Sequence, residues 1–507
     1  MNIRHALFPA VLALALATPL RAQTEPMVGG GAPWPTPPPA LSSIREADLR
    51  RDLNALAADT FRGREAGTID ELRASVWLAE RAREAGMLPA GEDGTYFQFF
   101  PMRRVRLSGA SSIEMAGRAL ALGRDAVVIS PTDAVVDAPL VWVGAADRAQ
   151  LAAMDLRGKV VAALLVAPRE LPPRDVYLRE WRYAWDALGQ RVATLQGRGA
   201  VAVVLVSDSV SDAAWGALAP DFARGTYGLD PASGEAARQP VVPVVWVRAG
   251  MAGAARVQGQ RFTARLGVES FTYPSVNVVA QVPGTDGRLK NDYVLFSAHQ
   301  DHDGVWHAAG SDSIWNGADD NATASVALLA IGRAFARQPG RRTALFVWHG
   351  AEERGLLGSR WFVDRPTVPK GAIVAVLNAD MIGRNHPDSA ALLGATPPHR
   401  NSRDLARVAL EANRAVSRFA IDSIWDRPTH PELWYFRSDH LPYARAGIPA
   451  LFFSTLPHRD YHTPRDESIR IDVAKLNRIT RWMYATGWAV ASSAARPRVD
   501  PDFRLER

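Results

Sequence analysis

The chain has 507 residues, of which 47% are hydrophobic and 22% charged, so it has the composition of a globular protein of roughly two to four domains. It contains no cysteine, which excludes disulfide frameworks, thiol catalysis and every metal site that needs a thiolate. The formal net charge is +6, but its arginines are scattered, whereas a nucleic-acid-binding protein usually gathers its charge in one patch; we therefore expect no nucleic-acid partner.

The first 22 residues have the pattern of a secretory signal peptide. A basic start at Arg4 and His5 precedes the apolar stretch Ala6–Leu20, which two prolines interrupt. No later segment offers about 18 consecutive apolar residues, so we predict a secreted or periplasmic protein without stable membrane insertion. An uncleaved membrane anchor is the alternative. Residues 23–40 are rich in proline and glycine and predict a flexible lead-in.

Residues 41–124 are expected to form the first part of the main domain. Ile44–Leu56 and Ile69–Ala85 have the apolar spacing of helices. Gly86 stands where a glycine commonly ends a helix. A polar turn, Thr60–Glu65, separates the two segments.

A different pattern occupies residues 125–268, where short β-rich runs recur between glycines. This predicts a small, separate β-rich domain with one or two helices. The candidate strands are Leu140–Val143, Lys159–Val166, Ala200–Val206 and Val241–Val247. The candidate helix Arg174–Leu195 carries four aromatic residues, which we interpret as a packing face rather than a ligand cage: Tyr177, Trp181, Tyr183 and Trp185.

Strands and helices alternate in residues 269–495, which predicts an α/β sheet with helices on both faces. The candidate strands are Val276–Val282, Tyr293–Ala298, Thr343–Trp348, Ile373–Leu377 and Ala450–Phe453. The candidate helices are Thr323–Arg337, Leu356–Val363, Arg403–Val416 and Val473–Ser493. The segment Asn385–Arg437 is interpreted either as a wall or lid of a pocket or as a surface excursion. Residues 496–507 are left as a tail.

Acids and histidines follow these strands where each one ends, which is the edge at which an open α/β sheet binds ligands. The first group is His299-Gln300-Asp301-His302. Residues two apart on an extended chain point the same way, and a ligating histidine commonly has its second nitrogen held by a carboxylate. We therefore predict His299 as a metal ligand and Asp301 as the acid that orients it. By itself this segment also fits a polar turn.

Two pairs of adjacent acids come next. Helix capping explains only one member of the pair Asp319 and Asp320, and we place Asp319 between two metals. The pair Glu352 and Glu353 follows a strand, and neighbours on an extended segment face opposite ways. One can then bind metal while the other reaches the attacking water, and their pKa values separate. A solvated pair at the start of a helix fits the sequence equally well.

Two further positions complete the set. Asp380 lies in an apolar sequence, where an acid is costly to bury without a partner. His462 lies in the segment Asp460–Asp466, and taken alone a histidine there is more often structural.

Taken together and in order, these segments resemble the dizinc aminopeptidases of metallopeptidase clan MH. The matching segments are SAHQDH, NGADDNA, AEERGLLGS, NADMIG, SDHLPYARAGIPALFF and YHTPRDE. The resemblance covers about Leu41–Met102 and Val276–Ser493, and residues 125–268 are similar to a protease-associated domain that many members carry as an insertion. The implied fold is an α/β domain of the zinc exopeptidase (phosphorylase/hydrolase-like) type, with a mixed central sheet and helices on both faces.

The resemblance also implies five ligands for two zinc ions, with cobalt or manganese as substitutes. These are His299 and Asp380 for one ion, Glu353 and His462 for the other, and Asp319 as the bridge. Asp320 follows the bridge, often through a cis peptide in the family. Glu352 matches the general base and Asp301 the partner of His299, while Tyr461 is a candidate for steadying the oxyanion.

The expected activity is removal of amino-terminal residues from a peptide substrate. A carboxypeptidase of the same superfamily is an alternative, although its larger type has a helical dimerisation domain after the peptidase domain, and here the match runs nearly to the end of the sequence. A glutaminyl cyclase, with a single zinc, and a non-catalytic binding protein are further alternatives, both disfavoured by the full ligand set. A serine hydrolase or a zincin is not expected, because the sequence has neither G-x-S-x-G nor H-E-x-x-H.

Overall fold

The structure is a computed structural model that describes residues 38–169, 171, 179–195, 197–230, 242–309 and 311–506. The predicted signal peptide and most of the predicted lead-in lie outside the described residues, as do Tyr177 and the first residues of two predicted elements. No helix within the described ranges is both long enough and apolar enough to span a membrane.

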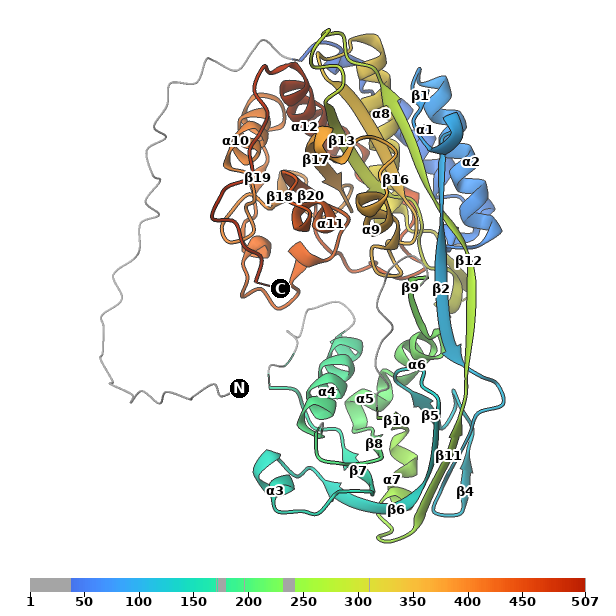
Figure 1. The fold of residues 1–507 in the computed structure, drawn as a ribbon. Coiled ribbons are helices and arrows are strands. Elements are labelled where there is room, and N and C mark those ends of the chain that lie inside the picture. Colours follow the sequence, from blue (N-terminus) through green and yellow to red (C-terminus); the bar gives the residue numbers. More distant parts are fainter. Residues whose placement is uncertain are drawn as a thin grey trace, which may run out of the picture. The chain divides into compact units, whose positions relative to one another are not determined.

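Ten of the described strands form the central sheet, in the order β19-β18-β20-β17-β13-β16-β12-β2-β9, with β1 beside β12 (Figure 1). Strand β13 is parallel to its neighbours β16 and β17, whereas β12 is antiparallel to both β16 and β2. The sheet is therefore mixed, as predicted. Its strands are β1 (Leu88–Pro89), β2 (Phe97–Leu107), β9 (Thr226–Leu229), β12 (Val268–Val282), β13 (Tyr293–His299), β16 (Thr343–His349), β17 (Ile373–Ala379), β18 (Ser389–Leu393), β19 (Ala420–Ile421) and β20 (Ala450–Ser454).

Helices cover both faces of this sheet. Successive side chains on a strand point to opposite faces, so neighbouring residues of β13 contact different helices. Phe296 of β13 meets Phe335 of α8 with ring centroids 5.5 Å apart. Its neighbour Leu295 belongs to a buried cluster with Phe362 of α9 and Tyr443 of α11. The prediction of helices on both faces is therefore confirmed. The helices of this part are α1 (Glu46–Leu56), α2 (Ile69–Glu84), α8 (Ala324–Arg337), α9 (Leu357–Asp364), α10 (Arg403–Ala412), α11 (His440–Arg445) and α12 (Val473–Ser492).

A second sheet of eight described strands has the order β4-β3-β11-β6-β7-β8-β10-β5. Two of its strands, β3 and β4, precede residue 125, where we predicted the insert to begin. The strands are β3 (Ser112–Met115), β4 (Arg118–Leu120), β5 (Ala126–Val128), β6 (Ala134–Gly144), β7 (Val160–Leu164), β8 (Ala202–Val206), β10 (Val244–Val247) and β11 (Arg261–Leu266). The helices of this segment are α3 (Arg148–Ala152), α4 (Arg179–Leu195), α5 (Ser209–Ala213), α6 (Trp215–Arg224) and α7 (Ala252–Ala255).

The two sheets are connected through β2 and β12, which pair along their length from Val268↔Leu107 to Val278↔Phe97. The chain also returns to the central sheet between two strands of the second sheet, β8 and β10. The returning strand is β9, which follows α6 and pairs with β2. Gly225 joins α6 to β9 with φ of 89°, and a Cβ atom there would lie 2.1 Å from the carbonyl oxygen of Val105. A glycine at this point therefore lets α6 approach the central sheet closely.

Candidate metal centre

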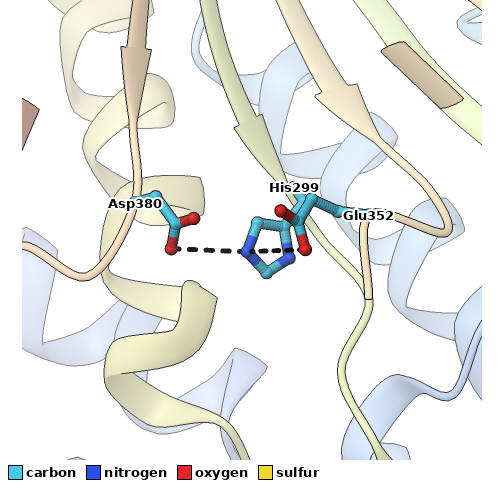
Figure 2. Close-up of side chains that lie close together, drawn as sticks. All are labelled: His299, Glu352 and Asp380. Carbon is cyan, nitrogen blue, oxygen red and sulfur yellow. Dashed lines mark ion pairs between the residues drawn. The ribbon is translucent and has the colours of Figure 1, made fainter. Parts of the chain in front are cut away.

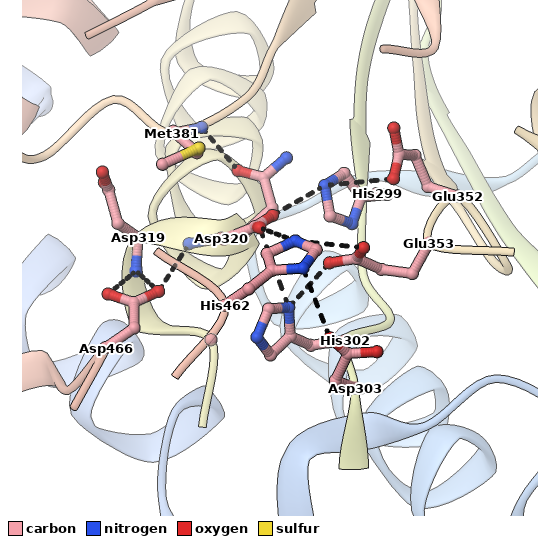
Figure 3. A network of polar contacts seen from close by, with 12 residues as sticks. His299, His302, Asp303, Asp319, Asp320, Glu352, Glu353, Met381, His462 and Asp466 are labelled. Atoms are coloured by element: carbon pink, nitrogen blue, oxygen red, sulfur yellow. Dashed lines mark hydrogen bonds and ion pairs between the residues drawn. The ribbon is translucent and has the colours of Figure 1, made fainter. Parts of the chain in front are cut away.

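Six acidic and imidazole side chains converge where the central strands end (Figures 2 and 3). They are His299 at the end of β13, Asp320 before α8, Glu352 and Glu353 after β16, Asp380 after β17, and His462 in the loop that follows β20. Asp320 lies between the two histidines: its Oδ1 is 3.2 Å from Nε2 of His299, and its Oδ2 is 3.1 Å from Nε2 of His462.

Asp320, and not Asp319, has the position that we predicted for Asp319. The Oδ1 of Asp319 accepts hydrogen bonds from the backbone N–H of Gly383 at 2.7 Å and from the hydroxyl of Thr323 at 3.2 Å. Its Oδ2 lies 3.4 Å from Nε2 of His458. Figure 3 shows the Asp319 carboxylate turned away from the cluster.

The choice between the two aspartates depends on the backbone before α8, which the sequence does not reveal. Residues Ala318–Thr323 form an irregular helical turn with non-helical dihedral angles at Asp320 and Asn321, and the two neighbouring carboxylates point in different directions from it. The carboxylate of Asp466 accepts the backbone N–H groups of both Asp319 and Asp320 at 3.0 Å, which fixes their direction. The cis peptide bond of this segment joins Asp320 to Asn321, one position later than the family resemblance implied.

The first half of the cluster surrounds His299, which is 1% exposed (Figure 2). Its Nε2 lies 3.4 Å from Asp380 Oδ1 and 4.0 Å from Glu352 Oε2. Its Nδ1 lies 3.1 Å from the backbone carbonyl of Asp301. A carbonyl only accepts hydrogen bonds, so this contact requires the proton on Nδ1 and leaves the lone pair of Nε2 directed at the cluster.

The second half of the cluster surrounds His462. Glu353 contacts two imidazoles: its Oε2 is 3.3 Å from Nε2 of His462 and its Oε1 is 2.8 Å from Nδ1 of His302. The Nδ1 of His462 lies 3.4 Å from Oδ2 of Asp303. We assigned no role to His302 or Asp303, although both lie in or next to the strand-end segment SAHQDH that pointed to His299.

Asp301 has a different contact from the one we predicted. Its carboxylate lies 3.9 Å from Nδ1 of His299, beyond hydrogen-bonding distance. Instead it accepts the backbone N–H groups of Glu352 at 3.0 Å and Glu353 at 3.3 Å. Asp301 therefore holds the loop of the glutamate pair, while its backbone carbonyl orients the imidazole.

The predicted candidate Tyr461 lies against His462, with ring centroids 4.0 Å apart, and its ring meets Trp434 edge-on at 6.0 Å. Burial raises the pKa of the Tyr461 hydroxyl, so this group stays protonated near neutral pH. Its part in catalysis stays a prediction.

A buried arginine, Arg64, holds backbone segments that lie next to the cluster. The Arg64 guanidinium is 1% exposed and donates to four backbone carbonyls, at distances from 2.7 to 3.1 Å, which belong to Leu56, Gln300, Asn316 and Gly317. Gln300 directly follows His299, and Asn316 and Gly317 lie shortly before Asp319 and Asp320. Arg64 therefore contacts the backbone next to both parts of the cluster. Burial lowers the pKa of Arg64 to about 10, so the group remains charged at neutral pH.

The two adjacent glutamates have pKa values that shift in opposite directions. Burial raises the pKa of Glu352 well above its ordinary value. Burial also acts to raise the pKa of Glu353, but His462 and His302 outweigh it and hold that pKa well below the ordinary range. The side chains therefore differ in chemistry as the sequence suggested, and the histidines beside Glu353 are the reason.

The donor set of the cluster fits divalent metal ions. The Nε2 atoms of His299 and His462 and the Oδ1 of Asp380 are buried and have no hydrogen-bond partner among the described residues. Leaving such atoms unpaired is costly unless an ion engages them. Three overlapping groups bring ligand atoms within 4.8 Å of one another: His299, Glu352 and Asp380; His299, Asp320 and Glu353; and Asp303, Glu353 and His462. Imidazole and carboxylate donors without thiolate suit zinc.

A cavity of about 470 Å³ opens beside the second half of this cluster. Glu353, Tyr461 and His462 line one part of it, and α4 and α6 of the second segment line another. Trp181 and Trp185 of α4 line this cavity. Tyr183 is 6% exposed and lies in a core cluster against which Trp181 also packs, as predicted, whereas Trp185 is 49% exposed, which corrects its interpretation as a packing residue. Arg437, at the end of the segment Asn385–Arg437, also lines the cavity, so part of that segment serves as a wall.

Comparisons with known proteins confirm the family resemblance. Residues 277–487 match the model of peptidase family M28. The chain is 35% identical over 117 residues to the leupeptin-inactivating enzyme 1 of Streptomyces exfoliatus, covering 22% of this chain and 23% of that protein. It is 25% identical over 248 residues to the aminopeptidase YwaD of Bacillus subtilis, covering 47% of this chain and 50% of that protein. The matches thus span about half or less of these curated relatives.

Solved structures show the same fold over most of the chain. An aminopeptidase from Aneurinibacillus sp. strain AM-1 superimposes with a TM-score of 0.57 at 18% identity, covering 92% of this chain and 98% of that one. A zinc aminopeptidase from Bacillus subtilis gives 0.54 at 18% identity, covering 91% and 99%. At these identities the likeness establishes the architecture, and the chemistry must be argued from the residues.

Proposed function

We propose that this chain, whose residues 277–487 belong to peptidase family M28, is a zinc-dependent aminopeptidase. One observation carries the proposal: the two carboxylate oxygens of Asp320 face the Nε2 atoms of two different histidines, at 3.2 and 3.1 Å. A carboxylate in that position suits a bridge between two metal ions. The names of the relatives, which are aminopeptidases, support the same class of reaction.

The proposed ligands form two sets that share Asp320. His299 and Asp380 would hold one zinc ion, and Glu353 and His462 the other. Bound zinc supplies Lewis-acid chemistry, in which it lowers the pKa of water toward about 7 and polarises a carbonyl oxygen. Three carboxylates, from Asp320, Glu353 and Asp380, would offset three of the four positive charges of two divalent cations.

Glu352 is the proposed general base. Its carboxylate lies at the edge of the cluster, 4.0 Å from Nε2 of His299, and Asp301 holds its backbone. A carboxylate there accepts the proton of the attacking water and then returns it to the leaving amine. Because burial favours the protonated form of Glu352, the acid can hold this proton between the two transfers.

A carboxypeptidase is the second candidate, since four arginines line the cavity and a terminal carboxylate would attract them. All four already contact an acidic side chain: Arg182 and Arg437 contact Glu432, and Arg224 and Arg354 contact Asp303. This pairing favours the aminopeptidase.

The direction of attack is tested with matched peptides. We expect the zinc-loaded protein to release the first residue of a peptide with a free amino terminus and to leave its N-acetylated counterpart intact. Release of the last residue from the acetylated peptide would identify a carboxypeptidase instead. Loss of ammonia from an amino-terminal glutamine, without cleavage, would identify a cyclase.

We further propose that the protein is exported and that the eight strands of the second sheet, which lie between Ser112 and Leu266, form a protease-associated insertion. The signal-like start of the sequence and the separate eight-stranded sheet support these two points. Amino-terminal sequencing of protein recovered outside the cytoplasm tests export, because a cleaved signal predicts a start near residue 23.

A further inference from the structure

The cavity beside the proposed metal site contains an acid that the mechanism does not use. Asp221 lies on α6 of the second segment and lines the cavity together with Glu353 and His462. Another acid of this wall, Asp303, accepts from Arg224 at 3.1 Å and from Arg354 at 2.9 Å and is thereby neutralised.

Asp221 has no such cationic partner. Among the described residues its carboxylate forms no ion pair, and its hydrogen-bond donor is the indole N–H of Trp181 at 3.4 Å. Burial and the nearby charge of Asp303 raise the pKa of Asp221 to about 6, while the more distant charges of Arg224 and His462 act to lower it, so the group is charged at neutral pH. A partly buried carboxylate in this state is stabilised by any cation that enters the cavity.

An aromatic wall stands next to this acid. Trp181 and Trp185 stack with ring centroids 5.5 Å apart and an interplanar angle of 5°, and Phe222 continues the stack at 5.8 Å and 4°. Trp185 is 49% exposed although it is large and apolar. The aliphatic stem of a lysine or arginine side chain can pack along such an aromatic surface while its charged group reaches a neighbouring acid.

The four arginines of the cavity contact acids other than Asp221. Glu432 contacts Arg182 and lies 3.2 Å from Arg437, while Glu65 lies 3.5 Å from Arg354 in addition to the contacts of Asp303. Arg224 also lies over the ring of Trp306 at 3.5 Å. Asp221 is therefore the acid of the cavity wall that is left for a ligand.

We propose that Asp221, with Trp181 and Trp185, binds a positively charged group of the peptide substrate. The inference rests on the proposed function, and it adds that the second segment takes part in substrate selection. The cation is an ammonium or guanidinium group, from either the amino terminus or the side chain of a lysine or arginine residue.

Calorimetric binding of two small probes separates these sources without requiring turnover. The probes are L-lysinamide and L-norleucinamide, which share the α-ammonium but differ in the side-chain charge. In Asp221→Asn we expect the affinity for lysinamide to fall about tenfold, as for a partly buried ion pair. An unchanged affinity for norleucinamide assigns the site to side chains, and an equal fall assigns it to the amino terminus.

Glu180→Gln is the matched control, because Glu180 is an exposed acid of the neighbouring α4 that does not line the cavity. Trp181→Phe keeps the ring and removes the donor to Asp221, so it should shift the affinities in the same direction if Asp221→Asn fails to fold. Unchanged affinities in the folded variants, or no binding of either probe by the unsubstituted protein, would overturn the inference. Binding that depends on Asp221 in a protein that cleaves no peptide would refute the proposed function alone.

Discussion

The carboxylate of Asp301 accepts the backbone N–H of Glu352 at 3.0 Å. The same carboxylate accepts the N–H of Glu353 at 3.3 Å, so one buried acid sets the direction of both glutamates. The strand end that carries His299 is thereby tied to the loop that carries the proposed base and a proposed ligand.

Asp301→Asn should therefore impair catalysis without removing the metal. An amide offers one acceptor atom and one donor group, so it cannot accept both N–H groups as the carboxylate does. We expect the peptidase rate to fall about 10- to 100-fold, as for other residues that orient a metal site. Rate measurement and elemental analysis on the same preparation check this, and an unchanged rate would remove the positioning role.

Glu352→Gln should retain zinc and lose most turnover. The amide preserves the shape of the side chain but cannot accept the proton of water, and general-base catalysis contributes about 10²- to 10⁴-fold. Glu353→Gln is the matched comparison on the next residue, and it should lose zinc because Glu353 contacts His462 at 3.3 Å. Near-normal turnover of Glu352→Gln would exclude this residue as the base.

The adjacent aspartates should separate in function. Asp320→Ala removes the carboxylate between the two histidines, and we expect zinc content to fall sharply. Asp319→Ala should retain zinc to a greater extent and mainly lower stability, by about 1–3 kcal/mol, because a buried N–H of Gly383 loses its acceptor. Elemental analysis and chemical denaturation distinguish the two. Greater zinc loss in Asp319→Ala would restore our original assignment.

Arg64→Met should destabilise the fold strongly. The four backbone carbonyls that accept from the guanidinium would lose their donors, and each unsatisfied buried group costs about 1–3 kcal/mol. Arg62→Met, on the same turn, is the control, because its side chain is 54% exposed and pairs with Asp70 at 3.5 Å. Denaturation midpoints compare the variants, and equal midpoints would show that Arg64 does not hold the turn.

The contacts of His399 predict a pH dependence of stability. Burial lowers the pKa of His399, but hydrogen bonds to Asp426 at 3.0 Å and Glu506 at 2.7 Å outweigh it and leave the pKa raised. A group whose pKa is higher in the folded than in the unfolded protein stabilises the fold when it is charged. This stabilisation is complete below the unfolded pKa of about 6.5 and is lost as the pH rises through the folded pKa.

His399→Gln should therefore lower Tm most at acidic pH, and the difference from the unsubstituted protein should shrink as pH rises. The exposed His386 provides a control, since His386→Gln removes a histidine of the same segment without these partners. A Tm difference for His399→Gln that is independent of pH would contradict the role of the charged imidazole.

The sequence by itself determined the α/β class and most strand positions, because apolar runs of β-branched and aromatic residues must be buried on both faces of a sheet. Tyr293–Ala298 and Thr343–Trp348 were predicted as strands, and each extends one residue further, to His299 and His349. The same logic placed acids and histidines at the ends of strands. We did not predict the long strand β2, because its polar and charged residues obscure the alternation of apolar and polar side chains. Its pairing with β12 identifies it as a strand.

Only the tertiary structure decided which neighbouring side chain faces the cluster and which distant segments reach it. Asp319 and Asp320 are equivalent acids in the sequence, and contacts from Arg64 and Asp466, far away along the chain, set the backbone that separates them. Nothing in the sequence indicated that Asp221 lines the cavity, for a similar reason. Asp221 lies on α6, and Gly225 lets this helix lie against β2. Local sequence patterns indicate which residues are buried and how they are spaced. The direction of a side chain and the residues around it depend on contacts between residues that are far apart in the sequence.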